Sequence, residues 1–129
     1  MIEIYTDGAS KGNPGPAGAG IFMKKGATLE RYAVPLGIMS NHEAEFHACI
    51  IALEKLQERD ERIVSLRSDS MLLVDAVEKD YVKQPIYKPL LERILILGAS
   101  FDHCFIKWIP GKENKEADHL ARQAIHKNV

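Results

Sequence analysis

The sequence predicts an α/β fold in which a five-stranded mixed sheet is flanked by helices. Three observations predict it: three strand-like segments that open the chain, later strand-like segments separated by helical patterns, and an apolar content of 46% over 129 residues. Strands joined by short turns form antiparallel meanders, whereas strands separated by helices commonly pair in parallel. We therefore expect three antiparallel strands followed by two parallel ones, in a single domain spanning residues 1–129.

The opening three strands are expected over residues 2–7, 18–24 and 28–35. The first of these alternates side chains with a period of two, as a half-buried strand does. The second and third flank the tripeptide Lys25-Gly26-Ala27, which is typical of a hairpin connection. Together the three segments predict an antiparallel meander.

Helical patterns alternate with strand patterns in the remainder of the chain. A helix is expected from Asn41 to about Asp60, with Ser40 or Asn41 as its N-cap. Pro85 and Pro89 mark a loop between two later helices. The remaining elements are expected as strands over residues 63–68 and 103–109, and as helices over residues 69–78, about 90–97 and 113–127.

Charge and cysteine content restrict the class of protein. The formal net charge of −1 gives no general basic field for nucleic acid, which weakens a function in binding alone. No stretch approaches the ~20 apolar residues of a membrane span, and the start of the chain lacks the basic-then-apolar order of a signal peptide. Cys49 and Cys104 lie in apolar runs without a CxxC spacing, which predicts reduced thiols in a cytoplasmic protein. We expect a monomer without membrane contacts.

A glycine-rich segment follows the first predicted strand. Residues 8–20 lack the closing Gly-Lys-Ser/Thr of a phosphate-binding P-loop and lead into a strand rather than a helix, so no nucleotide cofactor is expected. The glycines instead predict a tight turn that a sugar–phosphate backbone can approach closely.

Two aspartates end predicted strands. Asp7 precedes Gly8, a place where an aspartate commonly bonds the backbone of the following turn. Asp69 opens a predicted helix, where it would serve as an N-cap. The functional sites of α/β sheets also lie at the carboxyl ends of strands, so a structural and a functional interpretation remain open for each aspartate taken alone.

Two further acids lie near the starts of predicted helices. Glu45 falls on the apolar stripe of its helix with small residues such as Ala48, whereas Glu43 falls on the opposite side and is expected to face solvent. Glu45 is therefore either an edge residue that reaches solvent or a placed ligand. Asp118 lies in the first turns of the last helix, where the helix dipole favours an acid.

Taken together, these acids predict a metal site, because each lies in or beside a segment that must pack on one sheet. Four carboxylates at one point would repel and raise one another's pKa unless cations neutralise them. Mg²⁺ prefers oxygen ligands, and two such ions about 4 Å apart can stabilise both the attacking and the leaving oxygens of a phosphodiester displacement. The predicted catalytic and metal-binding residues are Asp7, Glu45, Asp69 and Asp118.

With these residues in view, the sequence resembles the type 1 ribonuclease H family over nearly its whole length. The stretch Tyr5–Gly18 resembles the family's first catalytic segment, and Asn41–Leu53, with Glu45 at the acid position, resembles its second. The tripeptide Ser68-Asp69-Ser70 resembles the third, and Trp108–Ala121 the fourth. Each motif alone has little specificity, whereas four in this order and spacing are specific.

The resemblance implies a ribonuclease H-like fold and hydrolysis of the RNA strand of RNA–DNA hybrids, giving 5′-phosphate and 3′-hydroxyl ends. It assigns the four acids to two Mg²⁺ ions, with Mn²⁺ as a substitute. A 2′-hydroxyl distinguishes RNA from DNA, and contacts of this kind read shape rather than sequence. The residues expected to contact the hybrid are Gly8, Ser10, Lys11, Gly12, Asn13, Asn41, His42, Ser70 and Lys112.

The chain departs from the family's pattern in several places. Asn41-His42 stands where many relatives have two consecutive asparagines, and Met71 stands where a glutamine often follows the third motif. Lys112 takes the place of a loop histidine thought to aid product release. The stretch 78–89 is too short for the basic helical insertion of some relatives, which predicts weaker affinity for the hybrid.

Two alternatives to a hybrid-specific nuclease remain open. One is a weakly active or inactive member of the fold that only binds nucleic acid, and the intact set of four acids argues against it. The other is a DNA nuclease or resolvase of the wider superfamily. Asn13 and Asn41 argue against it, because they favour recognition of ribose. Trp108 alternates with positions expected to be buried, so we place it in the core rather than in a platform on which bases stack.

Overall fold

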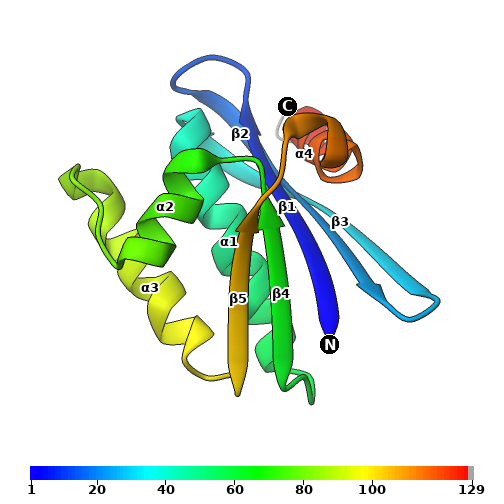
Figure 1. The fold of residues 1–129 in the computed structure, drawn as a ribbon. Helices are drawn as coiled ribbons and strands as arrows, with labels where there is room; N and C mark the ends of the chain where they lie inside the picture. Colours follow the sequence, from blue (N-terminus) through cyan, green and yellow to red (C-terminus); the bar gives the residue numbers. More distant parts are fainter. Residues whose placement is uncertain (128–129) are drawn as a thin grey trace.

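The computed structural model describes residues 1–127 as a mixed sheet with helices on both of its faces (Figure 1). The strands lie in the order β3-β2-β1-β4-β5. β1 is central and pairs antiparallel with β2 and parallel with β4, and β5 pairs parallel with β4. The predicted arrangement of three antiparallel and two parallel strands is confirmed. The strands are β1 (Ile2–Ser10), β2 (Gly15–Lys25), β3 (Thr28–Met39), β4 (Ile63–Ser68) and β5 (His103–Trp108).

Three helices cover one face of the sheet, and the last helix covers part of the other (Figure 1). No helix among residues 1–127 has both the length and the apolar character needed to span a membrane. The elements are α1 (Asn41–Gln57), α2 (Met71–Lys79), α3 (Lys88–Gly98) and α4 (Lys115–Lys127), with the short 3₁₀ helices η1 (Pro85–Tyr87) and η2 (Gly111–Glu113).

The main core lies between α1–α3 and the sheet. Ile2 and Ile4 of β1 and Phe46 and Leu53 of α1 are completely buried there. Burial of an apolar side chain of this size contributes roughly 1.5–3 kcal/mol relative to exposure. The Phe46 ring also stacks on Tyr87, with ring centroids 5.2 Å apart, which fastens η1 to α1. These contacts fix the position of α1 against the central strand.

Local capping determines where two of the helices begin. Ser40 caps α1 and forms a capping box with Glu43, whose side chain accepts a hydrogen bond from the Ser40 N–H. The prediction that Glu43 faces solvent was wrong, because this cap holds the side chain half-buried. α2 begins two residues later than predicted, because Ser70 rather than Asp69 accepts a hydrogen bond from the Leu73 N–H. The Asp69 carboxylate is therefore not used as a helix cap.

β1 and β2 extend further into the glycine-rich segment than predicted, and leave only residues 11–14 between them. Three of the glycines lie within these strands and face helices. A Cβ on Gly8 would overlap the backbone of α1, and a Cβ on Gly18 or Gly20 would overlap α4. At Gly18 and Gly20 the prediction of room for a sugar–phosphate backbone was wrong, because α4 occupies that room. At Gly8 the absent Cβ gives room to α1 instead.

Trp108 does not lie in the core, and this prediction was also wrong. It ends β5, an edge strand of the sheet, and its side chain is 41% exposed. An edge strand is covered on fewer sides than a central one, so Cys104 and Ile106 are only half-buried despite their alternation. Cys49, in α1, is buried, and both cysteines are free thiols as expected.

Candidate active site

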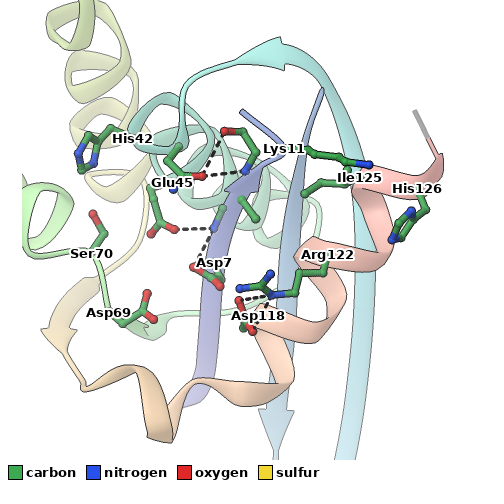
Figure 2. Close-up of a pocket in the computed structure, with 14 residues that line it drawn as sticks. Asp7, Lys11, His42, Glu45, Asp69, Ser70, Asp118, Arg122, Ile125 and His126 are labelled. Atoms are coloured by element: carbon green, nitrogen blue, oxygen red, sulfur yellow. Dashed lines mark hydrogen bonds and ion pairs between the residues drawn. The ribbon is translucent and has the colours of Figure 1, made fainter. Parts of the chain in front are cut away.

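The candidate site begins in β1, just beyond Thr6, the last residue of this strand that pairs with β4. Asp7 is 6% exposed and lies opposite Gly20 in the β1–β2 ladder. The Gly8 N–H donates to Asp7 Oδ1 at 3.0 Å and to Glu45 Oε1 at 2.7 Å (Figure 2). One backbone amide therefore holds two carboxylates from distant parts of the chain side by side.

Gly8 also explains why α1 comes close enough to deliver Glu45. The Cα of Gly8 faces the α1 backbone, where a Cβ would overlap Ala44 and Glu45. Glycine is the one residue without that atom, so the helix can rest directly on the strand. Glu45 is 8% exposed on the buried stripe of α1, as its spacing predicted. Its Oε2 atom is buried without a hydrogen-bond partner among the described residues.

Asp69 joins the site from the end of β4, the strand parallel to β1. One carboxylate oxygen each of Asp7, Glu45 and Asp69 lies within 4.8 Å of the other two. η2 lies next to the Asp69 carboxylate, because a Cβ added to Gly111 would stand 3.4 Å from Asp69 Oδ2. We refer to Asp7, Glu45 and Asp69 as the acidic triad.

Asp118 reaches the same cleft from the helix on the other face of the sheet. α4 packs on Gly20, where a Cβ would overlap the Ala117 carbonyl oxygen, and Gly20 lies opposite Asp7. Arg122 Nε donates to both carboxylate oxygens of Asp118 at 3.1 Å (Figure 2). Asp118 therefore borders the acidic triad, but it is paired with an arginine of its own helix.

Burial and nearby negative charges raise the pKa values of two members of the triad, Asp7 and Glu45. Burial raises the pKa of Asp7 far above its ordinary value, and Glu45 raises it further. Burial also raises the pKa of Glu45, and the charges of Asp69 and Asp118 act in the same direction. In the described part of the chain, no lysine or arginine forms an ion pair with the triad. The triad on its own lacks compensating positive charge.

The residues present fit a divalent metal ion. Every donor in the triad is a carboxylate oxygen, the ligand type that hard cations prefer. The buried and unpartnered Glu45 Oε2 has the environment of a ligand atom whose positive partner comes from outside the chain. The donor set suits Mg²⁺ and Mn²⁺ alike.

The triad lies in an open cleft of about 660 Å³ (Figure 2). Three of the predicted substrate contacts, Gly12, Asn13 and Lys112, are not part of its lining. The predicted site residues that do line it are Asp7, Gly8, Ser10, Lys11, Asn41, His42, Glu45, Asp69, Ser70 and Asp118.

Hydrogen bonds fasten the turn after β1 to the start of α1. The Ser10 N–H donates to Asn41 Oδ1 at 2.8 Å, and the Ser10 hydroxyl lies within hydrogen-bond distance of the same oxygen and of the Gly12 carbonyl. The Asn41 N–H donates to Asn13 Oδ1 at 3.3 Å. Asn13 and Gly12 thus support the rim of the cleft from outside it.

The sequence model of the RNase H family matches residues 1–126. The chain belongs to the RNase H family. EbsB of Enterococcus faecalis (strain ATCC 700802 / V583), provisionally named a hydrolase, is 45% identical over 129 residues, which cover 98% of this chain and 96% of EbsB. Ribonuclease H of Desulforamulus reducens (strain ATCC BAA-1160 / DSM 100696 / MI-1) is 34% identical over 137 residues, which cover 93% of this chain and 84% of that protein.

The RNase H-like fold is also found in solved structures of the family. LC11-RNase H1, solved in complex with RNA/DNA hybrid, superposes with a TM-score of 0.89 and 36% sequence identity. The match covers 98% of both chains. The predicted family and fold are therefore confirmed, and the acidic triad lies in an RNase H framework.

Four residues that line this RNase H-family cleft were not among the predicted site residues, and these are Ala9 of β1 and three residues of α4. The three from α4 are Arg122, Ile125 and His126. These three α4 residues follow Asp118 at the spacing of a single helix face, so the sequence indicates that they lie on the same side of the helix as Asp118. The sequence does not indicate that this side of α4 borders the cleft.

Replacement of Asp7 by asparagine is expected to stabilise the metal-free protein. Because the pKa of Asp7 is higher in the folded than in the unfolded state, its contribution to stability is fully present at low pH and is lost as the pH rises. We expect Asp7→Asn to raise the free energy of unfolding by about 1–2 kcal/mol near pH 8, and by less near pH 5. Urea denaturation in EDTA measures both values.

Addition of Mg²⁺ provides the control for this substitution. A ligand that binds only the folded state stabilises it, so the wild type should gain more stability from Mg²⁺ than the Asp7→Asn variant does. If the variant in EDTA were no more stable than the wild type at the higher pH, burial of the Asp7 carboxylate beside Glu45 would not destabilise the metal-free protein.

Proposed function

We propose that this protein is a metal-dependent endoribonuclease that hydrolyses the RNA strand of RNA–DNA hybrids and leaves 5′-phosphate and 3′-hydroxyl ends. The acidic triad carries the proposal, because three carboxylates within 4.8 Å of one another face an open cleft. The family match and the hybrid bound by LC11-RNase H1 support the substrate class. The proposed catalytic and metal-binding residues are Asp7, Glu45, Asp69 and Asp118.

The chain itself supplies ligands that are already in place. The Gly8 amide orients Asp7 and Glu45, and the β4–α2 turn presents Asp69 beside them. When bound, a pair of Mg²⁺ or Mn²⁺ ions supplies positive charge to the attacking and leaving oxygens of phosphodiester hydrolysis. In this proposal Asp118 is the fourth carboxylate, and Arg122 is its partner in the metal-free protein.

Polar groups on the rim of the cleft suit a sugar–phosphate backbone. Uncharged side chains such as Ser10 and Asn41 can exchange hydrogen bonds with a 2′-hydroxyl, the group that distinguishes RNA from DNA. Lys11 provides positive charge for a phosphate at the same rim. Contacts of this kind carry no information about bases, so cleavage should depend little on sequence. Further proposed contacts are Gly8, His42 and Ser70 in the lining, and Gly12, Asn13 and Lys112 beyond it.

A panel of matched nucleic acids tests this function. A uniform hybrid, RNA duplex, DNA duplex and single-stranded RNA are each incubated with Mg²⁺, Mn²⁺, Ca²⁺ or EDTA, and the products are resolved by length and by end chemistry. We expect cleavage of the hybrid alone, with Mg²⁺ or Mn²⁺ and not with Ca²⁺ or EDTA. Cleavage of the DNA duplex would instead establish a DNA nuclease, and efficient turnover with Ca²⁺ would contradict the two-metal chemistry.

A hybrid-binding protein with little turnover is the second candidate. It is favoured by the Arg122–Asp118 ion pair, because this pair occupies the fourth acid. The short stretch 78–89 offers only Lys79, Lys83 and Lys88 to the DNA strand, which argues for weak binding and so does not favour this alternative. Hybrid binding without product under every metal condition would establish this alternative.

A further inference from the structure

Trp108 connects the edge strand β5 to the acidic triad. Its indole Nε1–H donates to the carbonyl oxygen of Asp69 at 3.2 Å. The last pair in the β4–β5 ladder is Ser68 with Trp108, so Asp69 lies just beyond the end of regular pairing. The indole of Trp108 therefore supplies a hydrogen bond to the first residue after the paired part of β4.

Neighbouring residues of the same segment hold the surroundings of Asp69. The Ile109 N–H donates to the Ser68 carbonyl at 2.9 Å, one residue before Asp69. On the other side, Gly111 faces the Asp69 carboxylate, since its added Cβ would stand 3.4 Å from Oδ2. Trp108 and Ile109 therefore bond the backbone where β4 leads into α2, and Gly111 lies beside the carboxylate of Asp69.

We propose that Trp108 is a positioning residue for Asp69. Its hydrogen bond fixes the β4–α2 turn and thereby holds the Asp69 carboxylate beside Asp7 and Glu45, where these three acids would hold a divalent cation. A ring that is 41% exposed at the end of an edge strand lies outside the core, and its hydrogen bond to Asp69 ties it to the site. The link to catalysis rests on the proposed function, whereas the link to metal binding can be measured without it.

Fluorescence gives a readout that does not need catalysis. Trp108 is the single tryptophan of the chain, so tryptophan emission reports on the surroundings of this one indole. Titration with Mg²⁺ should change the emission of the wild type, because a divalent charge beside Asp69 changes the field at the nearby indole. The half-saturation should equal that found by calorimetry, and Asp69→Asn should abolish the change. Constant emission through calorimetric saturation of the wild type would overturn the proposal.

The substitution Trp108→Phe tests the hydrogen bond itself, because it keeps an aromatic ring and removes the donor. Loss of one hydrogen bond shifts an equilibrium by about 2–10-fold, so we expect the Kd for Mg²⁺ to rise and kcat to fall by about this factor. The KM for the hybrid should stay unchanged. A purely structural role would lower Tm without changing the Kd for Mg²⁺, and that result would overturn the proposal.

The substitution Phe105→Leu is the matched control. Phe105 is an exposed aromatic residue of the same strand, and the alternation of β5 places it on the opposite face from Trp108. This variant should retain the wild-type Kd for Mg²⁺, and an equal weakening in both variants would also overturn the proposal. If the wild type did not cleave the hybrid, the proposed function would fail, while the Mg²⁺ affinities would still decide the role of Trp108.

Discussion

The substitution Asp69→Asn is expected to lower the rate of hybrid cleavage by about 100-fold or more, because loss of a direct ligand should exceed the 10–100-fold effect of losing a residue that only supports one. The amide keeps the size of the carboxylate but is a poor ligand for Mg²⁺. The fold should be retained, since Ser70 rather than Asp69 caps α2 and no hydrogen bond of the Asp69 carboxylate holds the turn among the described residues. Steady-state cleavage and thermal unfolding measure the two effects separately.

Asp80→Asn provides the matched control, because it makes the same chemical change away from the cleft. Asp80 is exposed at the end of α2 with a positive φ of 53°, a conformation that asparagine also adopts readily. This variant should cleave at the wild-type rate. If Asp69→Asn kept a tenth or more of wild-type turnover, Asp69 would not be a metal ligand.

The substitution Gly20→Ala is expected to produce the largest loss of stability. The new Cβ would overlap the Ala117 carbonyl oxygen and stand 2.6 Å from the Ala121 nitrogen, and these are backbone atoms that cannot rotate away. Insertion of a methyl group into a packed contact costs about 1–3 kcal/mol and occasionally more, and a backbone clash belongs at the upper end of that range. We expect a free energy of unfolding lower by about 3 kcal/mol, measured by urea denaturation.

Cleavage activity should fall with Gly20→Ala as well, because displacement of α4 moves Asp118 away from Asp7. Gly98→Ala is the control, since Gly98 ends α3 and its added Cβ would make only an ordinary contact of 3.6 Å with Cys104. The control should retain both stability and activity. Wild-type stability in Gly20→Ala would mean that α4 does not rest on β2 as described.

The features that could be predicted from the sequence are those that depend on local patterns. Glu45 could be separated from Glu43 because only one of them falls on the apolar stripe of α1. Asp7 and Asp69 could be placed at one edge of the sheet because each was expected at the end of a strand. β1 continues to Ser10, but its parallel pairing with β4 stops at Thr6 and Ser68, and this brings the two aspartates together. No contact between distant side chains had to be known for these predictions.

The features that could not be predicted depend on which surfaces meet. A glycine in a turn and a glycine under a helix look alike in a sequence, so the role of Gly8 and Gly20 in bringing α1 and α4 onto β1 and β2 was missed. The spacing of Asp118 and Arg122 is compatible with an ion pair, but whether the pair faces the cleft depends on the packing of α4. The prediction that Trp108 is buried was wrong, because alternating residues in a strand are buried only where another element covers the face on which they lie.

Crystals grown with Mn²⁺ test the central claim most directly, because anomalous scattering locates the ions without reference to activity. We expect anomalous density in contact with carboxylate oxygens of Asp7, Glu45 and Asp69, and density for a second ion that Asp118 contacts after leaving Arg122. A map without anomalous density at the acidic triad, from crystals saturated with Mn²⁺, would contradict the claim that these acids jointly hold divalent cations.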